Sequence, residues 1–228
     1  MIRHIFIDLD ETILDFHIAE KVALTKTLEA LDIVPTKETC ELYSRLNNEQ
    51  WKKLELGEIS LEQVKLGRYE RLFSALGVER SAKEAVKLYE GNLSKGFWFK
   101  DGAEAFLKNI SADYSLALVT NGTAAVQRSR IKCAGLEAYF DHIFISQEIG
   151  YFKPAIEFFD YCFGCIENFD KEKAVMIGDS LTSDIKGGND AGIKTILYDP
   201  ESKPVDGDIK PTYTVRSFIE AETIIRRL

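Results

Sequence analysis

Two aspartates, Asp8 and Asp10, stand one residue apart at the end of the first apolar run of the chain. That run, Ile2 to Leu9, predicts a buried strand. Alternate residues of an extended strand share one face, so the two carboxylates can point the same way. Such neighbours repel each other unless a cation lies between them or one is protonated. The pair suits a magnesium site with a nucleophile and an acid/base, although aspartate is also common where a strand meets a turn.

Further polar residues follow later apolar runs of the chain. Thr120, Asn121 and Gly122 come directly before a predicted helix, where a hydroxyl, an amide and backbone N–H groups bind phosphate oxygens well. Lys153 follows another run and could neutralise a phosphoryl group, while Pro154 after it suits the first turn of a helix. Taken singly, these residues are equally typical of a helix cap, a turn glycine and a solvated surface charge.

A fourth predicted strand is followed by Asp179, and Asp184 lies in the first turn of the next predicted helix. Asp179 supplies another carboxylate for a metal, and Asp184 could orient it or a bound water. Each group of candidates follows a strand, so all of them converge on the carboxyl edge of the sheet, where open α/β sheets bind ligands. Four such coincidences are improbable, and the joint pattern indicates an active site.

Apolar runs and helical patterns alternate along most of the chain. Six runs predict buried strands: Ile2 to Leu9, Ser115 to Val119, His142 to Ser146, Ala174 to Ile177, Thr195 to Tyr198 and Tyr213 to Val215. Helical patterns lie between and after them: Asp101 to Ile110, Thr123 to Ala134, Pro154 to Ile166, Thr182 to Ala191 and Ser217 to Arg227. A polar loop, 199–207, precedes the last strand. This alternation predicts an α/β fold, a Rossmann-like, doubly wound parallel sheet.

The segment from Asp15 to Lys95 has a different pattern. Its apolar residues recur at helical spacing, as Leu24 and Leu28 do, charged residues are dense between them, and no run suggests a strand. The simplest interpretation is an all-helical domain inserted after the first strand. The predicted organisation is therefore an α/β catalytic core of residues 1–14 and 96–228 and a helical cap domain of residues 15–95.

The composition narrows the class of protein. Of 228 residues, 45% are hydrophobic and 29% charged, an ordinary globular balance. The net charge of −8 leaves no basic stripe to neutralise phosphates, which argues against nucleic-acid polymers and anionic membranes as partners. No secretory signal or membrane-spanning stretch is recognisable, so we expect a reduced, cytoplasmic setting. Cys162 and Cys165 lie within the apolar pattern of a buried helix face, which argues against a redox or metal role.

Together and in this order, the four groups of residues resemble the motifs of the haloacid-dehalogenase superfamily. The matching segments are Asp8-x-Asp10-x-Thr12, Thr120-Asn121, Lys153-Pro154 and Gly178-Asp179-x4-Asp184. The resemblance covers the whole chain, because the helical insertion resembles the C1-type cap of that superfamily. It implies a phosphatase with Mg2+ as its cofactor, in which Thr12 and Asp184 support the site.

The resemblance also implies a role for each of the main site residues. Asp8 would be the nucleophile, forming a phosphoaspartate, and Asp10 the general acid/base. Thr120 and Lys153 would bind the phosphoryl group. Asp179 would hold magnesium together with Asp8 and the backbone carbonyl of Asp10.

A narrower resemblance concerns the substrate. Leu118–Gly122, Val126–Arg130, Ile177–Ile185, and Trp51 followed by Glu55–Ile59 resemble segments of the bacterial house-cleaning pyrimidine 5′-nucleotidases. This implies a nucleoside monophosphate as the small phosphorylated substrate, with no protein partner indicated. Candidate contacts in or near the cap would be an aromatic ring to stack a base and polar groups for its edge: Phe16, Asn47, Trp51 and Arg68. For any one of them, ordinary packing of the aromatic rings in the cap and solvation of the polar groups is the better explanation.

Several other functions stay open at this point. A phosphoglycolate or phosphosugar phosphatase is the strongest alternative, and a phosphosugar mutase would use the same phosphoaspartate. The founding dehalogenases work without magnesium and lack the second aspartate of the first motif, so Asp10 and Asp179 weigh against dehalogenation. A non-catalytic binding module is disfavoured because none of the motif aspartates is missing.

Overall fold

The computed structural model describes residues 1–202 and 207–228, so part of the predicted loop at 199–207 lies outside the described residues. The chain divides into two compact units. One comprises Met1–Phe16 with Phe97–Leu228, and the other His17–Gly96. Within the described ranges, no helix is both long and apolar enough to cross a membrane.

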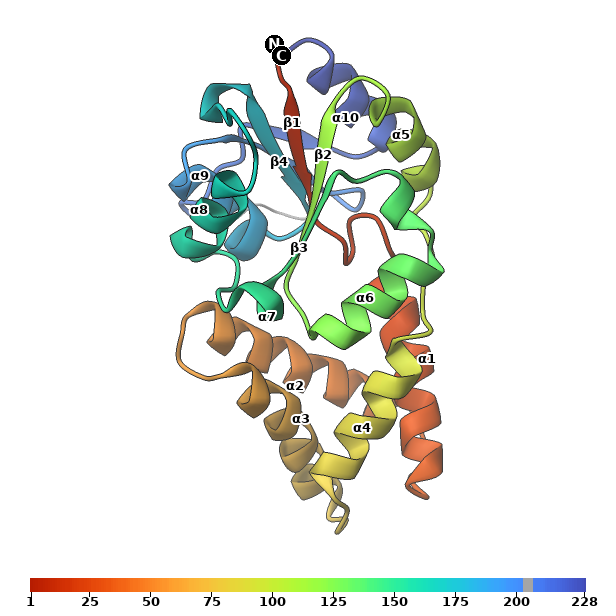
Figure 1. Cartoon of the computed structure of the whole chain (residues 1–228). Helices are drawn as coiled ribbons and strands as arrows, with labels where there is room; N and C mark the ends of the chain where they lie inside the picture. The colour runs from red at the N-terminus through yellow and green to blue at the C-terminus, as the bar shows by residue number, and fades with distance from the viewer. Residues whose placement is uncertain (203–206) are drawn as a thin grey trace. The chain divides into compact units, whose positions relative to one another are not determined.

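The first unit is built on a six-stranded sheet in which every pairing is parallel (Figure 1). Its strands are β1 (His4–Ile7), β2 (Ser115–Thr120), β3 (His142–Ile145), β4 (Ala174–Gly178), β5 (Lys194–Tyr198) and β6 (Tyr213–Val215). The spatial order is β3-β2-β1-β4-β5-β6, so the direction of winding reverses between β1 and β4. All six predicted strands are confirmed. In a doubly wound sheet, ligands bind outside the carboxyl ends of the strands at this reversal point.

Helices cover both faces of the sheet (Figure 1). They are α5 (Ala103–Ile110), α6 (Ala124–Cys133), α7 (Ser146–Ile149), α8 (Ile156–Gly164), α9 (Lys186–Asp190) and α10 (Phe218–Ile225), with short turns η1 (Leu136–Ala138), η2 (Lys171–Lys173) and a π-helical η3 (Leu181–Ile185). Along β1, Ile5 and Ile7 pack in one core with α5 and α10, while Phe6 packs in the other with α8. Because both faces of the sheet are buried, apolar residues do not alternate with polar ones along the strands.

Two helix starts differ from the sequence-based expectation. Pro154 does not begin a helix but lies in a turn, and α8 starts at Ile156. The carbonyl of Lys153 accepts a hydrogen bond from the side chain of Asn121, and this bond ties the backbone to the neighbouring loop just before the helix. The helix predicted from Thr182 is divided into the π-helical turn η3 and the short α9.

The second unit is formed by helices alone. They are α1 (Phe16–Ala30, whose first residue belongs to the α/β unit), α2 (Lys37–Glu55), α3 (Leu61–Leu76) and α4 (Ala82–Leu93). Ser60 and Gln63 form a capping box at the start of α3, and Gly77, with φ 65°, ends it. Tyr43 of α2, Tyr69 of α3 and the apolar side chains around them form the interior of the unit.

Candidate active site

Asp8 lies immediately after β1, at the reversal point of the sheet. Its backbone N–H donates to the carbonyl of Ile177 in β4, at 2.9 Å, which fixes the chain as the strand ends. The next residues fold back on themselves, since Ile13 donates to the carbonyl of Leu9 and Glu11 adopts a φ of 61°. Asp8 is 6% exposed. The nucleophile predicted from sequence is therefore held rigidly and largely out of water.

Lys153 is the centre of the charged cluster. Its Nζ donates to Asp8 Oδ1 at 2.6 Å, to Asp184 Oδ1 at 2.7 Å and to the carbonyl of Val119 at 2.8 Å. Burial opposes a charged amine, but the carboxylates of Asp184 and Asp8 outweigh it and raise the pKa of Lys153 above its usual range. With 1% of its surface exposed, Lys153 is a buried ammonium and not the solvated surface charge that its sequence position also allowed.

Asn121 connects the loop after β2 to Lys153. Its Nδ2 donates to the carbonyl of Lys153, and its Oδ1 accepts from the Lys153 N–H, each at 2.9 Å. These two bonds engage the side-chain amide that the sequence suggested for phosphate. The N–H of Gly122, also predicted to meet phosphate, donates instead to Ser146 Oγ at 3.0 Å. Asn121 therefore positions Lys153, and Ser146, which the sequence did not single out, positions the loop.

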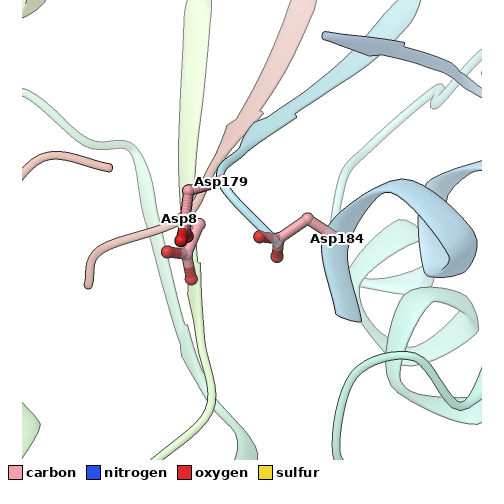
Figure 2. Close-up of side chains that lie close together, drawn as sticks. All are labelled: Asp8, Asp179 and Asp184. Atoms are coloured by element: carbon pink, nitrogen blue, oxygen red, sulfur yellow. The ribbon is translucent and has the colours of Figure 1, made fainter. Parts of the chain in front are cut away.

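Three carboxylates from separate segments meet beside Lys153. Asp8, Asp179 and Asp184 each place an oxygen within 4.8 Å of the others, and Figure 2 shows Asp184 directed toward the other two. A Cβ on Gly178 would lie 2.2 Å from Asp184 Oδ2, so a glycine is needed there for the approach. Thr12 supports Asp179 through a long hydrogen bond of 3.5 Å to its Oδ1. Asp184 is therefore part of the acidic cluster itself.

The charges of this cluster do not balance. Three carboxylates face the single ammonium of Lys153. Burial, together with the nearby Asp184, raises the pKa of Asp8 to about 7 although Lys153 opposes the shift. Burial and the charges of Asp8 and Asp184 likewise raise the pKa of Asp179 well above its usual range. A set of hard oxygen donors with excess negative charge fits a divalent cation such as Mg2+.

The carboxylate of Asp10 points to a different set of partners. Arg130 Nη1 donates to its Oδ1 at 2.6 Å, and Gln127 Nε2 donates to its Oδ2 at 2.8 Å. The same Gln127 nitrogen donates to Thr120 Oγ1 at 2.8 Å. The sequence singled out the segment Val126–Arg130 only through its resemblance to the nucleotidases, and no role was assigned to Gln127 or Arg130. The signal available was their helical spacing with Val126 and Ile131, which places two polar side chains on the buried face of α6.

The four candidate specificity residues lie in different surroundings. Phe16, partly buried, has its ring 5.7 Å from the Arg130 guanidinium. Asn47 and Arg68 are buried inside the helical unit, where Arg68 Nη1 donates to Asn47 Oδ1 at 3.0 Å and Asn47 Nδ2 donates to Glu20 at 2.8 Å. Trp51 is partly buried. The internal bonds of Asn47 and Arg68 do not support their predicted contact with a substrate.

The buried Lys153, shared by two carboxylates, lies at the carboxyl edge of the sheet, where doubly wound folds bind their ligands. The sequence model of the haloacid dehalogenase-like hydrolase family matches residues 5–198, and the chain belongs to that family. The family resemblance read from the four motifs is thereby confirmed.

The chain is similar over nearly its whole length to three characterised or structurally known relatives. It is 39% identical to pyrimidine 5′-nucleotidase PynA of Streptococcus pneumoniae, covering 95% of this chain and 92% of the relative. It is 31% identical to pyrimidine 5′-nucleotidase YjjG of Escherichia coli, covering 97% and 96%. The crystal structure of the HAD-hydrolase YfnB of Bacillus subtilis bound to magnesium superposes with a TM-score of 0.94 at 35% identity, covering 98% of both chains.

Proposed function

We propose that this hydrolase is a magnesium-dependent phosphomonoesterase that works through a phosphoaspartate on Asp8, with nucleoside 5′-monophosphates, pyrimidines foremost, as substrates. The observation that carries the proposal is the ammonium of Lys153, buried and bonded to both Asp8 and Asp184. Beside a carboxylate nucleophile, such a cation can neutralise the phosphoryl charge that develops during transfer. Two pyrimidine 5′-nucleotidases among the relatives support the substrate class.

The first chemical step transfers the phosphoryl group to the enzyme. The carboxylate of Asp8 attacks phosphorus, the bond from phosphorus to the leaving oxygen breaks, and Asp10 gives a proton to that oxygen. Lys153 stays charged and compensates the negative charge shared by Asp8 and the phosphoryl oxygens. The hydroxyl of Thr120, which like Asp10 accepts a hydrogen bond from Gln127, would donate to one of those oxygens.

The second step returns the enzyme to its starting state. Asp10, now a carboxylate, takes a proton from a water molecule whose oxygen attacks phosphorus. The bond between phosphorus and the Asp8 oxygen breaks, which releases inorganic phosphate and restores the Asp8 carboxylate. One side chain thus acts as acid and then as base, so its position matters in both steps.

Magnesium would be held by Asp8 and Asp179, with the backbone carbonyl of Asp10 as implied by the family and with Asp184 adjacent. When bound, it would neutralise charge on the nucleophile and the phosphoryl oxygens. Residues 15–95 would act as a cap that decides which substrates are accepted, since the acids and Lys153 recognise only phosphate and metal. The cytoplasmic setting stays a prediction.

Phosphate release from a panel of monophosphates tests the proposal. We expect magnesium-dependent turnover, with UMP, dUMP and TMP exceeding AMP, glucose 6-phosphate and phosphoglycolate in kcat/KM. A phosphosugar with the highest kcat/KM would overturn the assignment as a nucleotidase but not the assignment as a phosphatase. Full activity in excess chelator would contradict the magnesium dependence. No release from any ester would overturn the whole proposal.

A further inference from the structure

Two side chains of α6 hold both oxygens of the Asp10 carboxylate. Arg130 Nη1 lies 2.6 Å from Oδ1 and Gln127 Nε2 lies 2.8 Å from Oδ2. Arg130 is 0% exposed and Gln127 3%, whereas the Asp10 side chain keeps 26% of its surface exposed. The two buried side chains thus bind the Asp10 carboxylate from the interior, and the remaining surface of the Asp10 side chain is exposed. We call Gln127 and Arg130 the α6 clamp.

The hydrogen-bond pattern defines the orientation of the Gln127 amide. Its Nε2 faces two acceptors, the Asp10 carboxylate and Thr120 Oγ1, while its Oε1 accepts from Arg130 Nη1 at 2.9 Å. The flipped amide would set its oxygen against the carboxylate and its N–H groups against the guanidinium, so only one orientation is compatible. Arg130 therefore fixes Gln127 as well as Asp10.

The surroundings of the clamp leave Gln127 little room to move. A Cβ on Gly122 would approach Gln127 Cγ to 2.9 Å, so the glycine allows the glutamine side chain to pack directly under the loop after β2. Val126 and Ile131 anchor the same face of α6 in the interior. The ring of Phe16 packs near the Arg130 guanidinium, at 5.7 Å. These contacts hold both clamp side chains in one place.

We propose that Gln127 and Arg130 are positioning residues for Asp10, and that this role rests on the proposed phosphatase reaction. The clamp fixes the direction in which Asp10, as a protonated carboxyl group in the first step, presents its proton to the leaving oxygen. Because Gln127 also donates to Thr120, one side chain sets the distance between the acid/base and the hydroxyl placed for phosphate. The Gln127 N–H donates to the Thr120 hydroxyl, whose own proton makes a long hydrogen bond of 3.4 Å to the carbonyl of Asn121 and can be turned to a phosphate oxygen.

The effect of the clamp depends on the leaving group. A poor leaving group such as an alkoxide needs the proton from Asp10, whereas a nitrophenolate leaves without it. A misdirected acid therefore slows phosphorylation of the enzyme by nucleotides while sparing phosphorylation by activated aryl phosphates. A general loss of folding would slow both alike.

Rapid-quench measurement of phosphoenzyme formation separates these cases. The variants are Gln127→Ala, Arg130→Met and Arg130→Lys, and the substrates are UMP and a series of aryl phosphates from phenyl to dinitrophenyl. We expect the phosphorylation rate with UMP to fall on the order of 10- to 100-fold for Gln127→Ala and Arg130→Met. The rate with dinitrophenyl phosphate should change little in Arg130→Met and fall less than the rate with UMP in Gln127→Ala, where only the contact with Thr120 affects it. Arg130→Lys should recover part of the loss with UMP.

Arg128 is the matched control on the same helix. It is exposed and bonded to Glu148, at 2.9 Å and 2.6 Å, so Arg128→Met should keep the wild-type dependence on the leaving group. If circular dichroism shows that Arg130→Met is not folded, the comparison of Gln127→Ala and Arg130→Lys with the wild type decides the test. Wild-type rates in the Gln127→Ala variant, or equal losses across the whole substrate series, would overturn the clamp. A wild-type enzyme that hydrolyses none of these esters would overturn the proposed function, and the clamp with it.

Discussion

The α/β unit and the helical unit each bury a cation, but the surroundings of the two cations differ. Lys153 in the α/β unit is bonded to two carboxylates and faces a third acid, Asp179, close by. Arg68 in the helical unit lies 4.7 Å from the ring of Tyr89 and reaches the single carboxylate of Glu20 through Asn47. One cluster has an excess of negative charge, and the other is balanced.

This difference teaches how to interpret a buried charge. The charge-balanced network Arg68–Asn47–Glu20 joins the helices α1, α2 and α3 through hydrogen bonds inside the unit and so specifies how they pack. The cluster around Lys153 sets three carboxylates against one ammonium and needs a further cation, which is typical of a metal-binding site. The comparison predicts that equivalent substitutions in the two clusters have different consequences.

The largest effect should come from Asp8→Asn. An amide is a far poorer nucleophile than a carboxylate and also removes a charge from the metal site, so turnover should be abolished. Phosphate release under saturating UMP and magnesium measures it. Activity at a hundredth of the wild-type level, in protein free of contaminating phosphatase, would contradict the role of Asp8.

Lys153→Ala should have the second largest effect on catalytic activity. Removing the ammonium leaves Asp8 and Asp184 uncompensated and removes the charge that stabilises the phosphoryl group in transfer. We expect kcat/KM to fall on the order of 10²- to 10³-fold, the scale of a lost electrostatic contact at a reacting centre. Circular dichroism should show a folded protein, especially with magnesium present. A near-normal rate in the folded variant would contradict the catalytic role.

The sequence predicted the sheet and the edge residues because both depend on local patterns. Apolar runs of strand length, each followed by Asp, Thr or Lys, are visible without any tertiary information. The partners of those residues are not visible, because they come from far along the chain. Asp10 and Arg130 are 120 residues apart, and Asn121 and Lys153 are 32 apart. The pairing of β1 with β2 and of β2 with β3 brings these pairs together.

The same limit explains the residues whose surroundings differ from the expectation. Asn121 resembles a phosphate ligand by type, yet its amide is bonded to the Lys153 backbone. Asn47 and Arg68 are polar residues on helices that are rich in charge, and polarity alone suggested a surface facing a substrate. Helical spacing did not reveal that they meet Glu20 in the interior, since that contact depends on how α1, α2 and α3 pack.

The balanced cluster supplies the contrasting prediction, Arg68→Met. Loss of the guanidinium leaves the buried Asn47 oxygen without its donor and should lower the free energy of unfolding by about 1–3 kcal/mol. Urea unfolding followed by circular dichroism measures it. The folded fraction should still form the phosphoenzyme on Asp8 from dinitrophenyl phosphate at a rate close to wild type. A loss comparable to that of Lys153→Ala, with unchanged stability, would contradict the contrast between the two clusters.

The excess charge of the acidic cluster also predicts how stability depends on pH without metal. The pKa of Asp8 rises from 3.8 to about 7 on folding, so between these values the folded state binds a proton that the unfolded state has lost. The stability that this proton adds to the folded state is fully present below about pH 4, and it is lost as the pH rises through about 7. Between the two pKa values, the free energy of unfolding falls by up to about 1.4 kcal/mol per pH unit for each group whose pKa is raised in this way.

Thermal unfolding in chelator and in magnesium, from pH 5 to pH 8, makes this measurable. In chelator, the Tm of the wild type should fall more steeply from pH 5 to pH 8 than the Tm of Asp8→Asn, because the asparagine cannot bind that proton. Asp179 should keep part of the slope in the variant, because its pKa is also raised. Magnesium binds the ionised carboxylates, so the gap in Tm between the two conditions should widen as the pH rises. A gap that is constant, with the same slope in wild type and Asp8→Asn, would mean that the three carboxylates are not coupled to one cation site.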